Sequence, residues 1–405
     1  MAVNLTEPEK LHPVQGVALA ACTAGLKSNG NSDMALIACE AGTQAAAVFT
    51  QNAFCAAPVI IAREHIAQSS PRFLLINAGN ANAGTGKQGL ENALNTCTCI
   101  AEHFGQTSQQ VLPFSTGVIN QQLDMDVMHS GIESLVDGLG RDNWSDAAAA
   151  IMTTDTVAKG FSEQMSLAGA RITVTGISKG SGMICPNMAT MLAFIATDAR
   201  VEAKSLQRLL ERSNARSFNS ITVDGDTSTN DACVLLATGS AGGDELSDDH
   251  PQWPEFTVLI ERACKTLAQA IIRDGEGATK FIEVSVRGGI DANECRQVAY
   301  TIAHSPLIKT AFFASDPNLG RLLAAVGRSG LNAFDISSVS MRIDEVDIIV
   351  SGEPASDYTE ERGQAVMSRD EITVFVDLGR GDVEWTIWTT DLSYDYVRIN
   401  AEYRS

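Results

Sequence analysis

The chain has 405 residues, of which 44% are hydrophobic and 19% charged, which excludes a disordered chain and indicates a globular protein of one or two domains. The formal net charge of −20 argues against nucleic acid or an anionic membrane surface as a partner, but not against an anionic substrate. The nine cysteines form no CxxC pair, so neither a metal site nor a disulfide framework is predicted. No apolar run approaches the roughly 18 residues of a membrane helix, and residues 1–11 do not resemble a targeting signal. We therefore predict a cytoplasmic protein with no membrane partner.

The first third of the chain contains several predicted strands. Residues 34–50 are predicted to form a hairpin with apolar arms at 34–39 and 45–49, and another strand is predicted at 72–77. A further strand precedes Thr116 and Gly117, where glycine permits a backbone that presents an N–H and a hydroxyl at one point. Such donors could hold the oxyanion of a tetrahedral intermediate, although a simple turn is the commoner role of this pair.

An asparagine-rich loop follows the strand at 72–77 and extends over residues 77–86. We interpret it as a set of turns in which the Asn side chains bond their own backbone, and its proximity to a functional site stays open. A phosphate-binding loop is rejected, because Ala81 and Gln88 stand where that motif requires Gly and Ser or Thr.

The middle of the chain contains hydroxyl and lysine candidates. Residues 147–154 are predicted to end a helix, and the hydroxyls after it, including that of Thr153, are typical of caps. A strand at 171–176 leads into a glycine-rich turn that contains Lys179, and a lysine between glycines is usually solvated. The apolar run 191–195 predicts a buried strand.

Thr190 stands directly before that buried strand, after small and turn-forming residues. If the backbone is held strained there, its hydroxyl can attack the Ala189 carbonyl, and an N-to-O acyl shift followed by hydrolysis would cut the chain. The new terminal Thr190 would combine a nucleophile with its own base, because a free α-amine has a pKa of roughly 7.7–8.0. By itself, however, a threonine before a strand is far more often an ordinary β-former.

The second half of the chain alternates predicted helices and strands. Helices are predicted over 201–215 and around 260–271, and a strand over 281–286. Residues 371–389 are predicted to form a second hairpin around Gly379-Arg-Gly381. The segment 219–231 is read as a loop and hydrogen-bond network, because it lacks the distal glutamate of a calcium loop.

Two further positions would ordinarily carry no function. Glu276 lies between two glycines, which is typical of an exposed turn acid. The last ten residues, 396–405, would ordinarily fray.

A long motif points to one family. Lys179-Gly-Ser-Gly-Met-Ile-Cys-Pro-Asn-Met-Ala-Thr190-Met-Leu resembles the self-cleavage and nucleophile motif of the ornithine acetyltransferases, glutamate N-acetyltransferases of arginine biosynthesis. The resemblance implies an α/β fold, a layered sandwich of the N-terminal-nucleophile type. It also implies cleavage into an alpha chain, 1–189, and a beta chain, 190–405, with two such pairs forming a heterotetramer.

The resemblance also implies an activity and its residues. Thr190 would take acetyl from N-acetyl-ornithine and pass it to glutamate, with Thr116 and Gly117 as the oxyanion hole. The substrate-binding positions that it implies are Thr153, Lys179, Thr190, Glu276, Asn400 and Ser405. It implies no bound cofactor, but some members of the family also use acetyl-CoA as donor.

Two other functions stay open from the residues alone. One is an amidohydrolase or aminopeptidase with an N-terminal nucleophile and a related fold, in which water would complete the reaction. The other is a non-catalytic protein that binds amino acids, which would remain one uncut chain.

Overall fold

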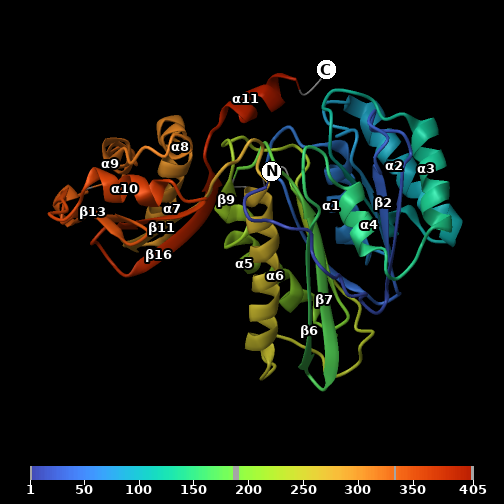
Figure 1. Cartoon of the computed structure of the whole chain (residues 1–405). Coiled ribbons are helices and arrows are strands. Elements are labelled where there is room, and N and C mark those ends of the chain that lie inside the picture. Colours follow the sequence, from blue (N-terminus) through green and yellow to red (C-terminus); the bar gives the residue numbers. More distant parts are fainter. Residues whose placement is uncertain (1, 186–190, 333, 403–405) are drawn as a thin grey trace. The chain divides into compact units, whose positions relative to one another are not determined.

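The computed structural model describes residues 2–185, 191–332 and 334–402, and the chain divides into two compact units (Figure 1). The larger unit comprises Glu7–Asn219 and Asp226–Ile271, and the smaller unit comprises Met1–Thr6, Ser220–Gly225 and Ile272–Ser405. The predicted cleavage point falls inside the sequence of the larger unit, so both predicted fragments contribute strands to it.

The larger unit is built on two sheets. The four-stranded sheet has the order β1-β2-β4-β5, with bounds β1 (Val17–Cys22), β2 (Met34–Cys39), β4 (Phe73–Asn77) and β5 (Val111–Ser115). The five-stranded sheet has the order β3-β10-β8-β7-β6, with bounds β3 (Gln44–Phe49), β10 (Ala232–Ala237), β8 (Leu192–Thr197), β7 (Ala170–Lys179) and β6 (Lys159–Leu167). The helices are α1 (Ala57–Gln68), α2 (Gly86–Phe104), α3 (Met125–Asp137), α4 (Trp144–Ala150), α5 (Ala203–Ala215) and α6 (Trp253–Arg273), of which α6 ends in the smaller unit.

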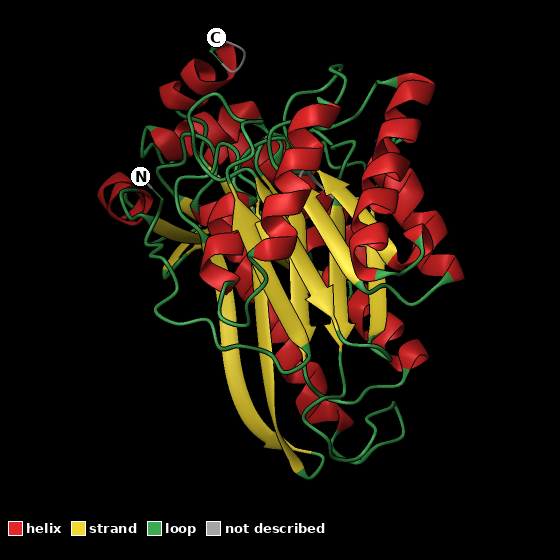
Figure 2. Ribbon diagram, turned by 90° about the vertical axis from the view of Figure 1, so that its right-hand side faces the viewer, coloured by secondary structure: helices red, strands yellow, loops and turns green. Residues whose placement is uncertain are grey.

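The two sheets pack face to face and are covered by helices. Phe114 of β5 meets Phe194 of β8 edge to face, with ring centroids 5.1 Å apart, inside a core that both sheets share. Helices α2 and α3 contribute to a second core on the other face of the four-stranded sheet. On the five-stranded sheet, Ser178 of β7 bonds the carbonyl of Leu267 in α6 at 3.4 Å. The predicted layered α/β sandwich is confirmed, and Figure 2 shows the strands with helices on both sides.

The hairpin predicted over residues 34–50 is wrong. Both arms are strands, β2 and β3, but β2 pairs with β1 and β4, whereas β3 pairs with β10 in the other sheet. The turn at Gly42, where φ is +89°, therefore carries the chain from one sheet to the other.

The smaller unit contains a seven-stranded sheet of order β14-β13-β12-β15-β11-β16-β9. Its strands are β9 (Ile221–Thr222), β11 (Phe281–Gly289), β12 (Ser340–Ile343), β13 (Val346–Val350), β14 (Glu353–Pro354), β15 (Glu371–Asp377) and β16 (Val383–Thr390). Its helices are α7 (Ala292–Ala303), α8 (Pro306–Phe313), α9 (Leu319–Gly327), α10 (Glu360–Met367) and α11 (Tyr394–Ala401). Strand β9 lies inside the segment 219–231, which we predicted to be entirely loop.

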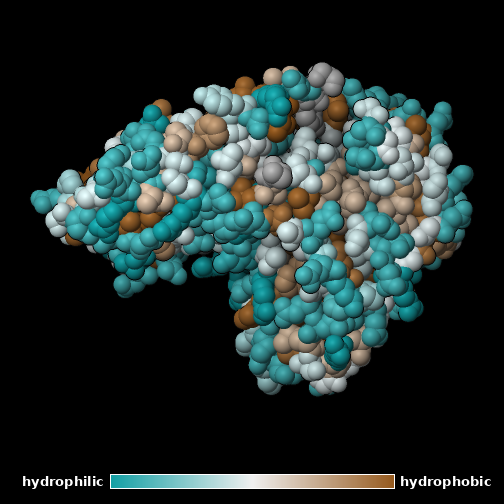
Figure 3. All heavy atoms as spheres, in the orientation of Figure 1, coloured by the Kyte–Doolittle hydropathy of each residue, from teal (hydrophilic) through white to brown (hydrophobic). Residues whose placement is uncertain are grey.

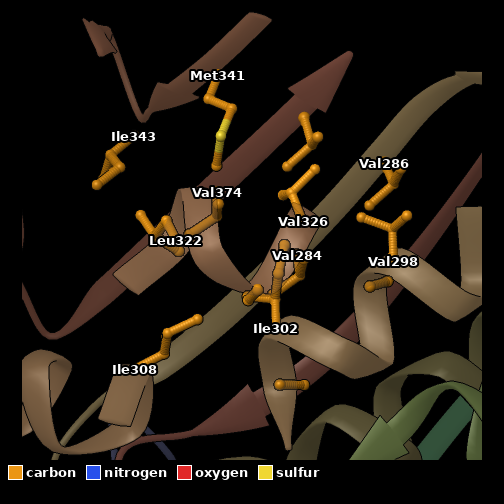
Figure 4. Close-up of a cluster of buried hydrophobic side chains, with 14 of the residues drawn as sticks. Val284, Val286, Val298, Ile302, Ile308, Leu322, Val326, Met341, Ile343 and Val374 are labelled. Carbon is orange, nitrogen blue, oxygen red and sulfur yellow. The ribbon is translucent and has the colours of Figure 1, made fainter. Parts of the chain in front are cut away.

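The core of the smaller unit lies between its sheet and helices α7, α8 and α9. Figure 4 shows side chains of β11, β12 and β15 pointing toward those of the three helices. Alternate residues of β15, namely Ile372, Val374 and Val376, are buried, as the period-two pattern predicts.

The second predicted hairpin, over residues 371–389, is also wrong. Strands β15 and β16 both form, but β11 lies between them, parallel to β15 and antiparallel to β16. The glycines at 379 and 381 therefore belong to a connection that passes the end of β11. The amide of Gly381 donates to the carbonyl of Gly288 at 2.9 Å.

Lys309 of α8 is a buried cation at the end of β16. Its Nζ donates to Thr389 Oγ1 at 3.0 Å and to the carbonyl of Thr390. Burial lowers its pKa from 10.5 to about 8, although Asp391 and Asp224 oppose this shift.

This lowered pKa predicts that the smaller unit becomes more stable at alkaline pH. Between pH 8 and 10.5 the native lysine is neutral while the unfolded lysine is charged, so the native state binds fewer protons and stability rises with pH. Relative to Lys309→Met, which has no such proton to lose, the wild type should gain about 3 kcal/mol of unfolding free energy over this range. Denaturant unfolding of both proteins at pH 7.5 and 10.5 measures the difference. Parallel pH profiles would contradict the prediction.

The visible face of the molecule is mostly hydrophilic, with scattered apolar side chains, as the charged composition predicts (Figure 3). None of the helices in the described part of the chain combines the length and the hydropathy of a membrane-spanning segment.

Candidate functional site

Thr116 and Gly117 directly follow β5 in the larger unit. The Thr116 N–H donates to the carbonyl of Asn77 at 2.9 Å. This bond fixes the backbone of Thr116 and does not involve its side-chain hydroxyl. Gly117 has a φ of +129°, and a Cβ there would lie 2.5 Å from the carbonyl carbon of Gly79. Only glycine fits this position. Among the described residues, no acceptor is hydrogen-bonded to the Gly117 N–H, so that donor remains available.

The asparagine-rich loop is a network of side-chain-to-backbone bonds, as predicted. Asn77 Oδ1 accepts from the N–H of Asn80 at 3.1 Å, and Asn80 Oδ1 accepts from the N–H of Asn82 at 2.7 Å. Because Gly79 packs directly against Gly117, the loop also supports the candidate oxyanion hole. The interpretation of the loop as turns is confirmed, and its role next to a functional site stays a prediction.

Lys179 is the last residue of β7, not a residue of the predicted glycine-rich turn, and it is buried. Its Nζ donates to Thr116 Oγ1 at 3.2 Å. An ammonium group can only donate, so the Thr116 hydroxyl accepts here and its own proton stays free for another acceptor. The nearby positive charge strengthens that second donation. Lys179 is therefore not the solvated lysine that is usual between glycines, because the strand continues to Lys179 and its side chain is buried.

Thr153 joins this group through Asp155. The Asp155 carboxylate accepts from the Thr153 N–H at 2.9 Å, from the Gly180 N–H at 2.7 Å and from Lys159 Nζ at 2.6 Å. Burial raises the pKa of Asp155, but the charges of Lys159 and Lys179 and the Gly180 N–H outweigh it, so the pKa lies below its usual range. Asp155 is therefore ionised at neutral pH and connects two segments that are distant in sequence.

Asp231, directly before β10, is a second buried acid in the larger unit. Its Oδ1 accepts from the N–H of Met191 at 3.1 Å, and Met191 directly follows Thr190 in the chain. Burial raises its pKa well above the usual value, while the Met191 N–H, the Ser228 hydroxyl and the Lys179 charge oppose the shift. Burial thus favours the neutral form of a carboxyl that is hydrogen-bonded to the residue after the candidate nucleophile.

The remaining described candidates lie in the smaller unit. Asn400 of α11 donates from Nδ2 to Glu276 Oε2 at 2.8 Å. Ser393 Oγ donates to the carbonyl of Gly277 at 2.6 Å, and a Cβ on Gly277 would lie 2.4 Å from the backbone nitrogen of Tyr396. The tail is therefore a docked helix through residue 401, and Glu276 is buried beside it instead of being an exposed turn acid.

The structure thus brings Thr116, Lys179 and, through Asp155, Thr153 together in the larger unit, and Glu276 with Asn400 in the smaller unit. Ala189, Thr190 and Ser405 lie outside the described residues. Within the described ranges, no group of three His, Cys, Asp or Glu side chains is arranged to hold a metal ion.

Four polar residues of the site have no role in the sequence-based prediction: Asp155, Lys159, Asn230 and Asp231. Asn230 Nδ2 donates to the carbonyls of Ala81 and Ser115, at 2.6 and 2.9 Å, and so ties the asparagine-rich loop to β5. Asp155 and Asp231 each lie next to threonines or asparagines in segments that we read as caps or loops. The composition contained a signal, but the partners that define the site are distant in sequence: Gly180 is 25 residues from Asp155, and Met191 is 40 residues from Asp231.

Comparisons with known proteins agree on one family. A model of the ArgJ family matches residues 18–405. The arginine biosynthesis bifunctional protein ArgJ of Pseudomonas fluorescens is 52% identical over 406 residues, and the protein of the same name from Psychrobacter arcticus is 52% identical over 408 residues; both matches span 100% of each chain. Among solved structures, ArgJ from Bacillus halodurans has 40% identity and a TM-score of 0.50, over 52% of this chain and 98% of that chain.

Proposed function

Because this chain belongs to the ArgJ family, we propose that it is a bifunctional acetyltransferase of arginine biosynthesis, which transfers acetyl from N-acetyl-ornithine to glutamate and also acetylates glutamate from acetyl-CoA. The observation that supports this most strongly is the full-length similarity, at 52% identity, to bifunctional arginine biosynthesis proteins. The buried Lys179–Thr116 contact, at the position of the expected oxyanion hole, supports the acyl-transfer chemistry.

The proposed catalyst is Thr190, released as a chain terminus when the bond between Ala189 and Thr190 breaks. Its hydroxyl attacks the acetyl carbonyl carbon of acetyl-ornithine, and its α-amine accepts the hydroxyl proton. The C–N bond of the substrate then breaks, and the same proton passes to the departing ornithine amine. Glutamate attacks the acetyl-threonine ester in the second half-reaction, which releases N-acetylglutamate and restores the hydroxyl.

Thr116 and Gly117 stabilise the oxyanion in both half-reactions. The Gly117 N–H and the Thr116 hydroxyl are the two donors, and Lys179 raises the donor strength of the hydroxyl by bonding its oxygen. Lys179 has three N–H donors, so the same ammonium can also bind a substrate carboxylate. Thr153, Glu276, Asn400 and Ser405 complete the proposed substrate contacts, with Glu276 pairing with an ammonium group.

The architecture of the larger unit favours fragments that stay together after cleavage. In the order β3-β10-β8-β7-β6, strands β3, β7 and β6 belong to the fragment 1–189, and β10 and β8 to the fragment 190–405. The pairs β10–β3 and β8–β7 therefore cross between the proposed fragments, with six residue pairs in each ladder. We propose a heterotetramer of two such fragment pairs and a cytoplasmic location.

The test is transfer of a labelled acetyl group by the purified protein. Acetyl-ornithine labelled in its acetyl group should give labelled N-acetylglutamate only when glutamate is present, and a short quench should leave the label on a fragment that begins at Thr190. Acetyl-CoA with glutamate, without acetyl-ornithine, tests the second activity. Release of free acetate at the same rate without glutamate would instead identify a hydrolase and contradict the proposal.

A further inference from the structure

Asp33 directly precedes β2 and lies at the same edge of the four-stranded sheet as the candidate oxyanion hole. In the register of this sheet, Asn77 of β4 pairs with Met34 of β2 on one side and with Ser115 of β5 on the other. The residues that adjoin these three are therefore neighbours at one edge of the sheet. The carbonyl of Asp33 accepts from the N–H of Ala78 at 2.8 Å, so the neighbouring backbone segments are also bonded to each other.

The Asp33 carboxylate organises the connection between β1 and β2. It is completely buried and accepts from four consecutive backbone N–H groups, those of Ala24 at 2.7 Å, Gly25 at 2.9 Å, Leu26 at 2.6 Å and Lys27 at 3.1 Å. Hydrogen bonds to an ionised group are stronger than those between neutral groups, and a buried site strengthens them further. The carboxylate therefore fixes the backbone of this short loop.

The loop packs against Gly79 through Leu26. A Cβ on Gly79 would lie 2.6 Å from the Cβ of Leu26 and 2.8 Å from its carbonyl oxygen, so the two residues are in direct contact. Gly79 in turn lies against Gly117, where a Cβ would be 2.5 Å from the Gly79 carbonyl carbon. The Val118 N–H donates to the Gly79 carbonyl at 3.4 Å. Because close-packed contacts of this kind leave little freedom, the position of Leu26 limits that of Gly79, and Gly79 limits that of Gly117.

We propose that Asp33 is a positioning residue for the oxyanion hole: it holds Leu26 against Gly79, which keeps the Gly117 N–H aimed at the oxyanion. This inference rests on the proposed function, because the role of Gly117 as an oxyanion donor comes from it. The negative charge that this donor stabilises forms only in the transition state, so a displaced Gly117 lowers kcat and not substrate affinity. The competing explanation is structural: Asp33 would only stabilise the connection between β1 and β2.

Two variants remove different parts of this set of contacts. Asp33→Asn keeps one accepting oxygen, but its NH₂ opposes at least one of the four N–H groups, so the loop should loosen. Leu26→Gly removes the Cβ that lies against Gly79 and leaves the carboxylate and all formal charges in place. Per cleaved protein and well below each melting temperature, kcat should fall roughly 10- to 100-fold in Asp33→Asn and by less in Leu26→Gly, while KM stays within about twofold.

The double variant Asp33→Asn/Leu26→Gly tests whether the two residues act through one contact. If they do, its kcat should lie within about twofold of that of Asp33→Asn, whereas losses that multiply would show independent effects and overturn the proposal. Wild-type kcat in Asp33→Asn with a lowered melting temperature, or a change in KM alone, would leave Asp33 as a structural residue only. If Asp33→Asn does not fold, an unchanged kcat in Leu26→Gly overturns the proposal equally.

Asp198→Asn is the matched control. Asp198 is also buried and accepts from two backbone N–H groups, those of Thr173 at 2.6 Å and Gln15 at 3.4 Å, but it follows the end of β8 that lies away from Lys179. Its kcat should stay at the wild-type value.

Hydrogen exchange, measured on peptides that cover residues 77–80 and 116–118, separates a failure of this inference from a failure of the proposed function. Exchange there should be faster in Asp33→Asn than in the wild type, and unchanged in Asp198→Asn. A wild type without acetyl transfer would refute the proposed function, whereas the exchange rates would still test the contact. Equal exchange in Asp33→Asn and the wild type would overturn the role of Asp33 even in an active protein.

Discussion

Replacing Thr190 with alanine is expected to leave a single uncut chain of 43.0 kDa without measurable acetyl transfer. The substitution removes the hydroxyl that would attack the Ala189 carbonyl, so no new terminus forms. It also removes the nucleophile and, with it, the amine that would act as base. Loss of a serine nucleophile that acts as a unit with its base costs about 10⁶-fold in a serine protease. Intact-mass measurement and the labelled-acetyl assay read out both effects on one preparation.

Two further variants make the Thr190 result specific. Thr190→Ser keeps a hydroxyl and should still produce the fragments 1–189 and 190–405, with reduced transfer. Thr98→Ala removes a threonine hydroxyl from α2 that bonds the Leu94 carbonyl of the same helix and no other group among the described residues, and should behave as the wild type. An alanine variant that retains transfer activity, or a wild type that is active as one intact chain, would refute the role of Thr190.

The sequence predicted where strands form better than it predicted how they pair. Both arms of 34–50 and both arms of 371–389 are strands: the first two are short apolar runs, and the last two are rich in β-branched and aromatic residues. Pairing depends on which sheet each strand joins. In both cases a partner from elsewhere in the chain, β10 or β11, occupies the position that a hairpin would have filled. No local pattern contains that information.

The site was predictable where the family resemblance covers it and not where it depends on tertiary contacts. The Thr116–Gly117 pair and Lys179 were predicted from the resemblance. In the structure, Lys179 Nζ lies 3.2 Å from Thr116 Oγ1. Asp155 was visible only as one acid among threonines. The Asp155 carboxylate accepts from the N–H of Gly180, 25 residues later in the chain. That hydrogen bond depends on where β7 ends, which no local pattern around Asp155 predicts.

Thr116→Val is expected to lower kcat by about 10²- to 10³-fold, with little change in KM. Valine matches threonine in shape but removes the hydroxyl donor, and loss of one oxyanion donor costs roughly 2.7–4 kcal/mol in the transition state elsewhere. The backbone bond from Thr116 N to Asn77 O does not involve the side chain and should remain. Pre-steady-state acetylation of Thr190, measured by quench and mass analysis, isolates the affected step.

The matched variant Thr116→Ser keeps the hydroxyl and should stay within a few-fold of the wild type. Lys179→Met offers a second comparison, because it removes both the polarisation of the Thr116 hydroxyl and a proposed carboxylate ligand, so kcat and KM should change together. If Thr116→Val instead raised KM and left kcat unchanged, Thr116 would be a ground-state ligand and the oxyanion would need another donor. Whether the substitution changes kcat or KM decides the role of Thr116, because only an interaction made in the transition state changes kcat without changing substrate affinity.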